Sequence, residues 1–122
     1  MGDVALGVVD ILSNDNAFYN YESKYAAGGS EHILPADLPQ DIYRKIQTYA
    51  LTAHQVLGCK GVSRSDFRYD DTPGGDGDLV ILETNTQPGM TGTSLVPEIA
   101  QHAGHSFEEL VEWMIRDATC DR

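Results

Sequence analysis

Two strand-like segments on either side of a glycine-rich stretch constrain the fold of this chain more than any other feature. Residues 61–69 alternate between polar and apolar side chains, and residues 79–84 form a short, mainly apolar run. The residues between them, 70–78, contain a Pro-Gly-Gly sequence and a further glycine, which is typical of a loop between paired strands. The sequence therefore predicts an antiparallel hairpin made of these two strands.

Polar side chains would come together on this hairpin. Arg64 and Asp66 are two positions apart, as are Glu83 and Asn85, so each pair shares one face of its strand. Antiparallel pairing would place Asp66 close to Glu83, and two neighbouring carboxylates repel each other unless a cation lies between them. Carboxylate and amide oxygens suit a hard cation such as Mg²⁺, completed by phosphate oxygens and water. The spacing alone equally fits solvated polar residues at strand ends.

Three helices are predicted around the hairpin. Apolar residues recur at helical spacing over 39–57, between a proline that suits a first helical turn and a glycine that suits the C-terminal stop. A shorter helix is predicted over 94–103, with Ser94 as the N-cap. A last helix over 106–118 opens with a capping box formed by Ser106 and Glu109. Its predicted buried stripe consists of Phe107, Leu110, Val111, Met114 and Ile115.

The N-terminal third is predicted to contain a strand over residues 4–12, an aromatic extended segment over 18–25 and a loop over 26–37. Together with the hairpin and the helices, this indicates a single domain over residues 1–122 of the α+β class. We expect one antiparallel sheet, built from the strands near 4–12, 61–69 and 79–84, with the three helices packed against it.

Four motifs in the same order give the chain a resemblance to a known family. It resembles the C-terminal part of the D-alanine–D-alanine ligases, which belong to the ATP-grasp superfamily, from about residue 2 to residue 118. The motifs are Phe18-Tyr19-Asn20-Tyr21-Glu22-Ser23-Lys24-Tyr25, Arg64-x-Asp66, Glu83-x-Asn85-x-x-Pro88-Gly89-Met90-Thr91 and Ser94-Leu95-Val96-Pro97. Two departures are Ser23, where the family often has Ala, and Asn20, where Asp is more usual.

The resemblance implies a metal and phosphate site. It implies that Asp66, Glu83 and Asn85 bind two Mg²⁺ ions, with Mn²⁺ as a possible substitute, and that Glu83 bridges them. Glu83 and Asn85 would thereby also take part in binding ATP. Lys24 would reach the phosphate that is transferred, and Tyr25 would belong to the active-site loop. Without the resemblance, Lys24 reads as an ordinary surface lysine.

The resemblance also implies how the reacting groups are held. Arg64 and the backbone N–H of Gly89 would stabilise the charge that develops on the reacting carbonyl oxygen, and Ser94 with the Leu95 N–H would hold the carboxylate of a second D-alanine. Each of these residues also has a plain structural interpretation. Arg64 suits an ion pair, Gly89 a turn, and Ser94 a simple helix cap.

The activity implied by the resemblance is ATP-dependent formation of D-alanyl-D-alanine for peptidoglycan synthesis in the cytoplasm. Relatives that use D-lactate or D-serine share these motifs, and a non-catalytic ATP-grasp relative is a second alternative. The family has N-terminal and central domains that this chain lacks, so we expect the 122-residue chain to be inactive alone. The full-length enzyme is expected to be a homodimer.

Composition excludes some functions. A net charge of −11 argues against a nucleic-acid or membrane-surface partner, because no basic patch is available to neutralise phosphates. Cys59 and Cys120 fit a reduced, cytoplasmic chain, and no signal peptide or membrane-spanning run is present in the sequence. Trp113 is expected to pack in the last helix. The four histidines lack metal-ligand spacing and are expected at the surface or at helix ends: His32, His54, His102 and His105.

Overall fold

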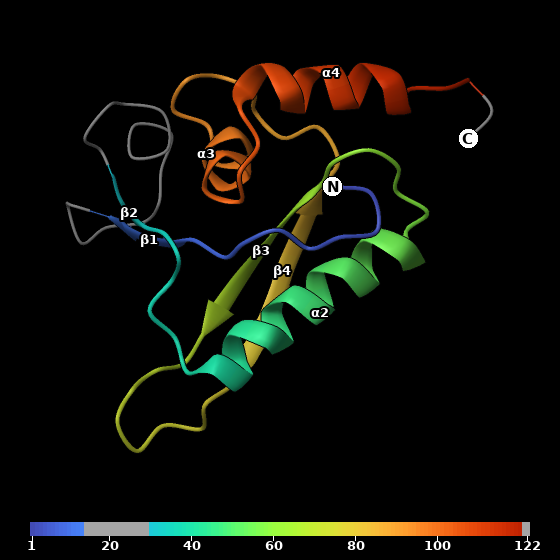
Figure 1. Ribbon diagram of the computed structural model, residues 1–122. Helices are drawn as coiled ribbons and strands as arrows, with labels where there is room; N and C mark the ends of the chain where they lie inside the picture. Colours follow the sequence, from blue (N-terminus) through green and yellow to red (C-terminus); the bar gives the residue numbers. More distant parts are fainter. Residues whose placement is uncertain (14–29, 121–122) are drawn as a thin grey trace.

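The computed structural model describes residues 1–13 and 30–120, and its architecture is α+β (Figure 1). Two short hairpins and three helices make up the described part of the chain. The elements follow in the order β1 (Asp10–Ser13), β2 (Ser30–Ile33), α2 (Gln40–Val56), β3 (Arg64–Tyr69), β4 (Leu79–Asn85), α3 (Leu95–His102) and α4 (Phe107–Asp117). The predicted extended segment at 18–25 lies outside the described residues.

The strands form two separate antiparallel sheets, β1–β2 and β3–β4, rather than the single sheet that we expected. The predicted strand 4–12 was also too long, and β2 lies within residues 26–37, which were predicted to be a loop. The reason is visible in the hydrogen bonds of the N-terminal segment. Side chains of α2 bind its backbone: the Tyr43 hydroxyl accepts from the Val8 N–H at 3.0 Å, and Gln47 Nε2 donates to the Leu6 carbonyl at 2.9 Å. These contacts replace a strand ladder.

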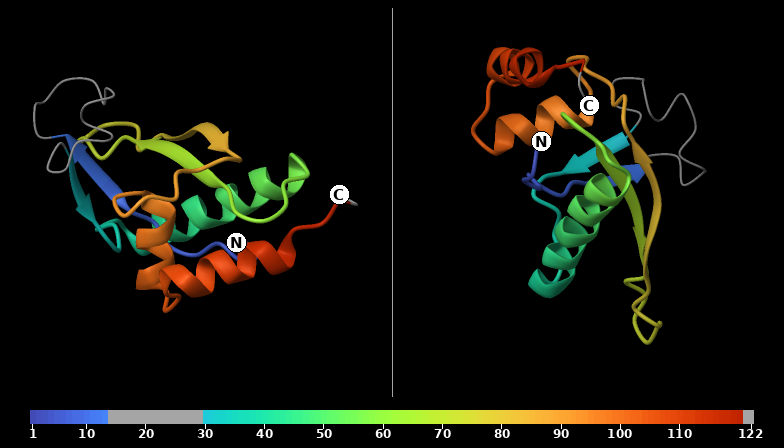
Figure 2. Two further views of the ribbon diagram at one scale, coloured as in Figure 1. Left: turned by 90° about the horizontal axis from the view of Figure 1, so that it is seen from above. Right: turned by 90° about the vertical axis from the view of Figure 1, so that its right-hand side faces the viewer.

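Helix α2 packs against one face of the β3–β4 hairpin, as the three views of Figures 1 and 2 agree. Its limits match the predicted range of 39–57. Pro39 occupies the N-cap position, and Gly58 follows the helix with a φ of +69°, a left-handed conformation that glycine adopts without a steric penalty. The helix was thus predictable from the residues at its two ends as well as from the spacing of its apolar residues.

The loop between β3 and β4 is organised by one side chain. The Asp70 carboxylate accepts hydrogen bonds from the N–H groups of Thr72 at 3.0 Å and Asp76 at 3.2 Å. The Thr72 side chain, together with these backbone groups, lowers the pKa of this carboxyl. Gly75 passes so close to it that a Cβ there would lie 2.6 Å from Asp70 Oδ2. The predicted hairpin loop over 70–78 is confirmed, and a larger residue at position 75 would force the Asp70 side chain to shift.

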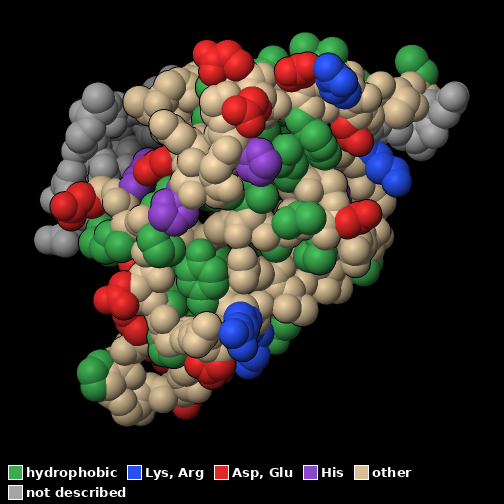
Figure 3. All heavy atoms as spheres, viewed as in Figure 1, with side chains coloured by type: hydrophobic (Ala, Val, Ile, Leu, Met, Phe, Trp, Pro, Cys, Tyr) green, Lys and Arg blue, Asp and Glu red, His purple; other side chains and the backbone are tan. Residues whose placement is uncertain are grey.

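A cluster of buried apolar residues lies between the N-terminal segment, α3 and α4, and Ala36 and Ile46 are buried outside it. The cluster consists of Val62, Val96, Ala100 and Leu110, with partly buried apolar residues packed around it, namely Met1, Leu6, Met90, Trp113 and Met114. The packing role expected for Trp113 is confirmed. Figure 3 shows the outer surface of one face, where apolar side chains (green) lie among many acidic ones (red) and few basic ones (blue).

Helix α4 follows its sequence prediction in part. The Ser106 hydroxyl accepts a hydrogen bond from the Glu109 N–H at 3.1 Å, which is one half of the predicted capping box. Leu110 is fully buried, but Phe107 is 45% exposed and Ile115 is 70% exposed, so the predicted buried stripe was too wide. Leu110, Trp113 and Met114 form the side of the helix that packs into the core cluster.

His54 was expected at the surface or at a helix end; it lies in the last turn of α2, and it is buried. Its Nδ1 lies 2.7 Å from the hydroxyl oxygen of Ser63, the residue that precedes β3, and the side chain joins α2 to the hairpin. Burial lowers the pKa of the imidazole below its ordinary value of 6.5, which favours the neutral ring.

Among the helices in the described ranges, none is long and apolar enough to cross a membrane.

Substituting Leu110 tests the position of the core. Leu110→Ala is expected to lower the free energy of unfolding by about 2–5 kcal/mol, because it removes a fully buried side chain and leaves a cavity. The matched control is Ile115→Ala on the same helix, where 70% of the residue surface is exposed and the change should stay within about 0.5 kcal/mol. Urea unfolding followed by Trp113 fluorescence measures both. Equal losses in the two variants would contradict the described core.

Candidate functional site

The register of the β3–β4 hairpin brings four polar residues onto one face. Arg64 pairs with Asn85, and Asp66 pairs with Glu83. Directly paired residues of an antiparallel ladder lie on the same side of the sheet, and residues two apart share a face. The predicted approach of Asp66 to Glu83 is therefore confirmed by the register, and Arg64 and Asn85 lie next to them.

This polar face is the side of the hairpin opposite to α2. The residues in alternation with it point the other way: Ser63 contacts His54 of α2, and Ser65 Oγ lies 2.9 Å from Thr84 Oγ1 across the ladder. Arg64 and Asp66 are half-buried, and Glu83 is exposed. Helix α2 thus supports the hairpin from behind and leaves the four polar side chains accessible from the front.

An irregularity in the ladder lies directly beside the polar face. Asp66 pairs with Glu83, whereas the next residue, Phe67, pairs with Ile81, so Leu82 is an extra residue on β4. Such a bulge increases the local twist and changes the direction of neighbouring side chains, and bulges are frequent next to active sites. The bulge determines how Glu83 is presented, and no pattern in the sequence indicated it.

Arg64 and Asp66 form a two-point ion pair. Arg64 Nε lies 2.9 Å from Asp66 Oδ1, and Arg64 Nη2 lies 3.3 Å from Asp66 Oδ2. The guanidinium is thereby held beside the Asp66 carboxylate on the polar face. This geometry fits the structural interpretation of Arg64, and it also fits a role in which a pre-oriented positive group faces a reacting centre.

The expected metal ligands are only partly arranged as a cluster. No group of three or more His, Cys, Asp or Glu side chains suited to a metal occurs within residues 1–13 and 30–120. The polar face supplies two carboxylates, those of Asp66 and Glu83. Asn85 Oδ1 accepts a hydrogen bond from the Gln87 N–H at 2.8 Å, which starts the turn after β4. An amide oxygen has a second lone pair, so this bond leaves one acceptor position.

The loop after β4 brings Gly89 and Ser94 into contact. A Cβ on residue 89 would lie 2.8 Å from Ser94 Oγ, so only glycine fits there without a shift. Ser94 Oγ also accepts a hydrogen bond from the Thr91 N–H at 2.9 Å and lies 2.7 Å from Thr91 Oγ1. The two residues that the resemblance assigns to different parts of the reaction are therefore neighbours. Thr91, which belongs to the third motif but was assigned no role from the sequence, contacts Ser94 as well.

Ser94 occupies the N-cap position of α3, as predicted, but its side chain makes no capping hydrogen bond to the helix. Its hydroxyl is used within the 91–94 turn instead. The first turn of α3 begins with the N–H groups of Leu95 and Val96, followed by Pro97, which has no N–H to donate. Helix starts of this kind bind anions through their unpaired N–H groups.

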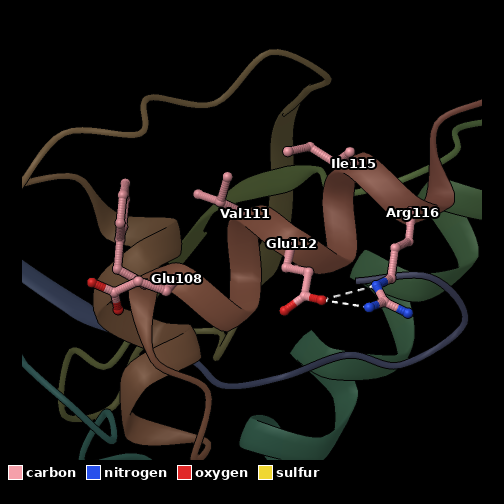
Figure 4. Close-up of a pocket in the computed structure, with 6 residues that line it drawn as sticks. Glu108, Val111, Glu112, Ile115 and Arg116 are labelled. Carbon is pink, nitrogen blue, oxygen red and sulfur yellow. Dashed lines mark hydrogen bonds and ion pairs between the residues drawn. The ribbon is translucent and has the colours of Figure 1, made fainter.

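Two expected site residues cannot be placed. Lys24 and Tyr25 lie outside the described residues. A separate shallow groove runs along α4 and is lined by Phe107, Val111 and Ile115, with a hydrogen bond from Arg116 Nε to Glu112 Oε1 at its edge (Figure 4). None of the expected site residues lines this groove.

Comparison with known proteins decides the family. The model of the family described as "D-ala D-ala ligase C-terminus" matches residues 2–116. The chain belongs to the D-alanine–D-alanine ligase family. The resemblance drawn from the four motifs is therefore confirmed.

Curated relatives in this family are similar over the whole chain. A D-alanine–D-alanine ligase of Rhizobium meliloti is 62% identical over 122 residues, and D-alanine–D-alanine ligase B of Mesorhizobium japonicum is 65% identical over the same length. In each case the match covers 100% of this chain and 40% of the relative. The chain thus spans well under half the length of these ligases and corresponds to their C-terminal part.

Solved ligase structures share the fold. D-alanyl-alanine synthetase A from Vibrio cholerae superposes with a TM-score of 0.70 at 30% identity, covering 92% of this chain and 33% of that one. A D-alanine–D-alanine ligase from Bacillus anthracis, solved in complex with ATP, gives the same TM-score at 24% identity and the same coverage. The α+β fold is therefore that of the C-terminal lobe of an ATP-grasp ligase, as the sequence predicted.

Proposed function

We propose that this chain is the metal- and acceptor-binding lobe of an ATP-dependent ligase that joins two molecules of D-alanine. The observation that carries the proposal is the shared hairpin face of Arg64, Asp66, Glu83 and Asn85, which leads through the Gly89 turn into the start of α3. The family match and the names of the relatives support it. The relatives' remaining part would supply the rest of the ATP site, so the chain alone is proposed to be inactive.

The proposed reaction has two steps. The carboxylate of the first D-alanine takes the terminal phosphoryl group of ATP, which gives an acylphosphate and ADP. The amine of the second D-alanine then attacks the carbonyl carbon, and the C–O bond to phosphate breaks after loss of a proton from nitrogen. The products are D-alanyl-D-alanine, ADP and phosphate, which fits peptidoglycan synthesis in the cytoplasm.

The donor atoms on the hairpin face fit Mg²⁺, and Mn²⁺ as a substitute. Asp66 and Glu83 offer carboxylate oxygens from paired positions, Asn85 offers an amide oxygen, and no soft ligand is part of this set. These three residues would hold two ions together with ATP phosphates. When bound, the ions would neutralise charge on the phosphate oxygens during transfer. Lys24, outside the described residues, is proposed to neutralise charge on the transferred phosphate.

The remaining residues hold the reacting groups. Arg64, already oriented by Asp66, and the Gly89 N–H would stabilise the negative oxygen of the tetrahedral intermediate. Ser94 Oγ and the Leu95 N–H would bind the carboxylate of the second D-alanine at the start of α3. Tyr25, outside the described residues, is proposed to take part in substrate binding. We also infer that the complete enzyme is a homodimer, as expected from the family. D-lactate or D-serine is the second candidate for the acceptor, because relatives that use these acceptors share the same sequence motifs.

The function is testable in a chimaeric ligase, in which residues 1–122 replace the matching C-terminal part of the Rhizobium meliloti relative. The 62% identity over this part makes the replacement conservative. ATP, Mg²⁺ and D-alanine are supplied, and D-alanyl-D-alanine and phosphate are measured. Chain-specific substitutions can then be made within residues 1–122.

Removing the Ser94 hydroxyl should mainly weaken acceptor binding. In the chimaeric ligase, Ser94→Ala is expected to raise the KM for the second D-alanine about tenfold with little change in the donor step, because one hydrogen bond to a carboxylate is lost. The matched control is Ser106→Ala, which removes the serine hydroxyl at the start of α4 and should change stability alone. Unchanged acceptor KM in Ser94→Ala would contradict the assigned acceptor site.

A further inference from the structure

A contact between β2 and α3 lies beside the proposed acceptor site and has no part in the proposed mechanism. His32 Nδ1 is 2.6 Å from Glu98 Oε2, although the two residues are 66 positions apart in the chain. Their side chains are 21% and 37% exposed, so the contact is partly shielded from water. An ionised carboxylate can only accept hydrogen bonds, so the imidazole Nδ1–H is the donor.

Glu98 lies close to the N–H groups that are proposed to bind the acceptor carboxylate. It lies in the first turn of α3, and its N–H donates to the Ser94 carbonyl at 3.4 Å. Negative side chains are attracted to the start of a helix, where the unpaired N–H groups carry partial positive charge. An incoming substrate carboxylate seeks the same N–H groups. The Glu98 carboxylate is therefore a built-in competitor for the anion that Ser94 and Leu95 are proposed to bind.

The hydrogen bond to His32 holds the Glu98 carboxylate away from the N–H groups at the start of α3. One of its oxygens is held against β2. The imidazole also polarises this carboxylate and reduces its repulsion of a second negative group nearby. The pairing with His32 therefore explains how an acidic residue in the first turn of α3 is compatible with anion binding there.

We propose that His32 is a positioning residue, which keeps the Glu98 carboxylate away from the start of α3 so that the carboxylate of the acceptor amino acid can bind there. This inference rests on the proposed function. It assigns His32 no contact with the substrate, and it predicts that the effect of His32 is transmitted entirely by Glu98.

The test measures the two D-alanine sites separately in the chimaeric ligase. Product formation as a function of D-alanine concentration reports the acceptor KM. Trapping of the acylphosphate with hydroxylamine reports the donor step without an acceptor carboxylate. In His32→Ala the acceptor KM is expected to rise on the order of three- to tenfold, the size of one screened charge interaction, while the hydroxylamine rate stays unchanged.

Three further variants separate positioning from general damage. His32→Asn places an N–H donor near the position of Nδ1 and should restore most of the acceptor affinity. The double variant His32→Ala/Glu98→Gln should restore it as well, because the competing charge is gone. His102→Ala, an exposed histidine in the last turn of the same helix, is the matched control and should have no effect.

The outcomes are distinguishable. A wild-type chimaeric ligase that folds but makes no D-alanyl-D-alanine would overturn the proposed function, and the inference with it. An active wild type whose acceptor KM is unchanged in His32→Ala would overturn the inference alone. The inference alone would also be overturned if His32→Ala raised the acceptor KM and the double variant His32→Ala/Glu98→Gln kept the same raised KM.

Discussion

Replacing Arg64 by alanine in the chimaeric ligase is expected to lower turnover by about 10²–10³, the cost of losing one donor to a developing oxyanion. The guanidinium is held in place by two hydrogen bonds to Asp66, so its position is set before the substrate binds. Because the lost interaction would form only in the transition state, kcat and kcat/KM should fall together. Phosphate release at saturating ATP and D-alanine measures the change.

Two variants sharpen this prediction. Arg64→Lys keeps the positive charge but loses the planar fork, so its turnover should lie between those of the wild type and Arg64→Ala. Arg68→Ala removes an exposed arginine four positions further along β3 and should leave turnover unchanged. Equal effects of Arg64→Ala and Arg68→Ala would show that Arg64 acts only through the general charge of the strand.

Substituting Glu83 should have the second large effect. In Glu83→Gln of the chimaeric ligase, the Mg²⁺ concentration needed for half-maximal activity is expected to rise at least about 10–100-fold, the range already seen when outer-shell groups of metal sites are removed. Glu83 lies opposite Asp66, and in the proposed bridging role its carboxylate could not be replaced by a neutral amide without loss of charge.

Metal titration of phosphate release, with Mg²⁺ and separately with Mn²⁺, measures this effect. Glu108→Gln, an exposed glutamate on α4, is the matched control for the change in net charge. Unchanged Mg²⁺ and ATP dependence in Glu83→Gln would remove Glu83 from the metal site. In the isolated 122-residue chain, Mg²⁺ binding is expected to be weak, because ATP phosphates supply much of the ligand set.

The hairpin at the centre of the site was predictable from the sequence. Alternation along 61–69, a glycine-rich loop and an apolar return strand are local signals, and together they set the pairing of Asp66 with Glu83. The bulge at Leu82 was not predictable, since no turn or glycine signal marks it within the apolar run of β4. Helix α2, in contrast, was predictable, because Pro39 and Gly58 indicate where it begins and ends.

Specific side-chain contacts, two of them long-range, explain what the sequence did not indicate. Tyr43 and Gln47 bind the backbone of residues 6–8, so an apparent strand forms no ladder there. Ser94 has the residue type of a helix cap but is bound by Thr91 instead. The contact between His32 and Glu98 joins segments 66 positions apart, and neither residue carries a motif that would have indicated the pairing.

The most direct test of the proposed function is formation of D-alanyl-D-alanine by the chimaeric ligase, compared with the isolated chain. The dipeptide is identified by mass, and phosphate release is measured with D-alanine, D-serine and D-lactate as acceptors. We expect the chimaeric ligase to form D-alanyl-D-alanine with ATP and Mg²⁺, and the isolated chain to release no phosphate. A folded chimaeric ligase that is inactive with D-alanine, or that prefers one of the other acceptors, would contradict the proposed function.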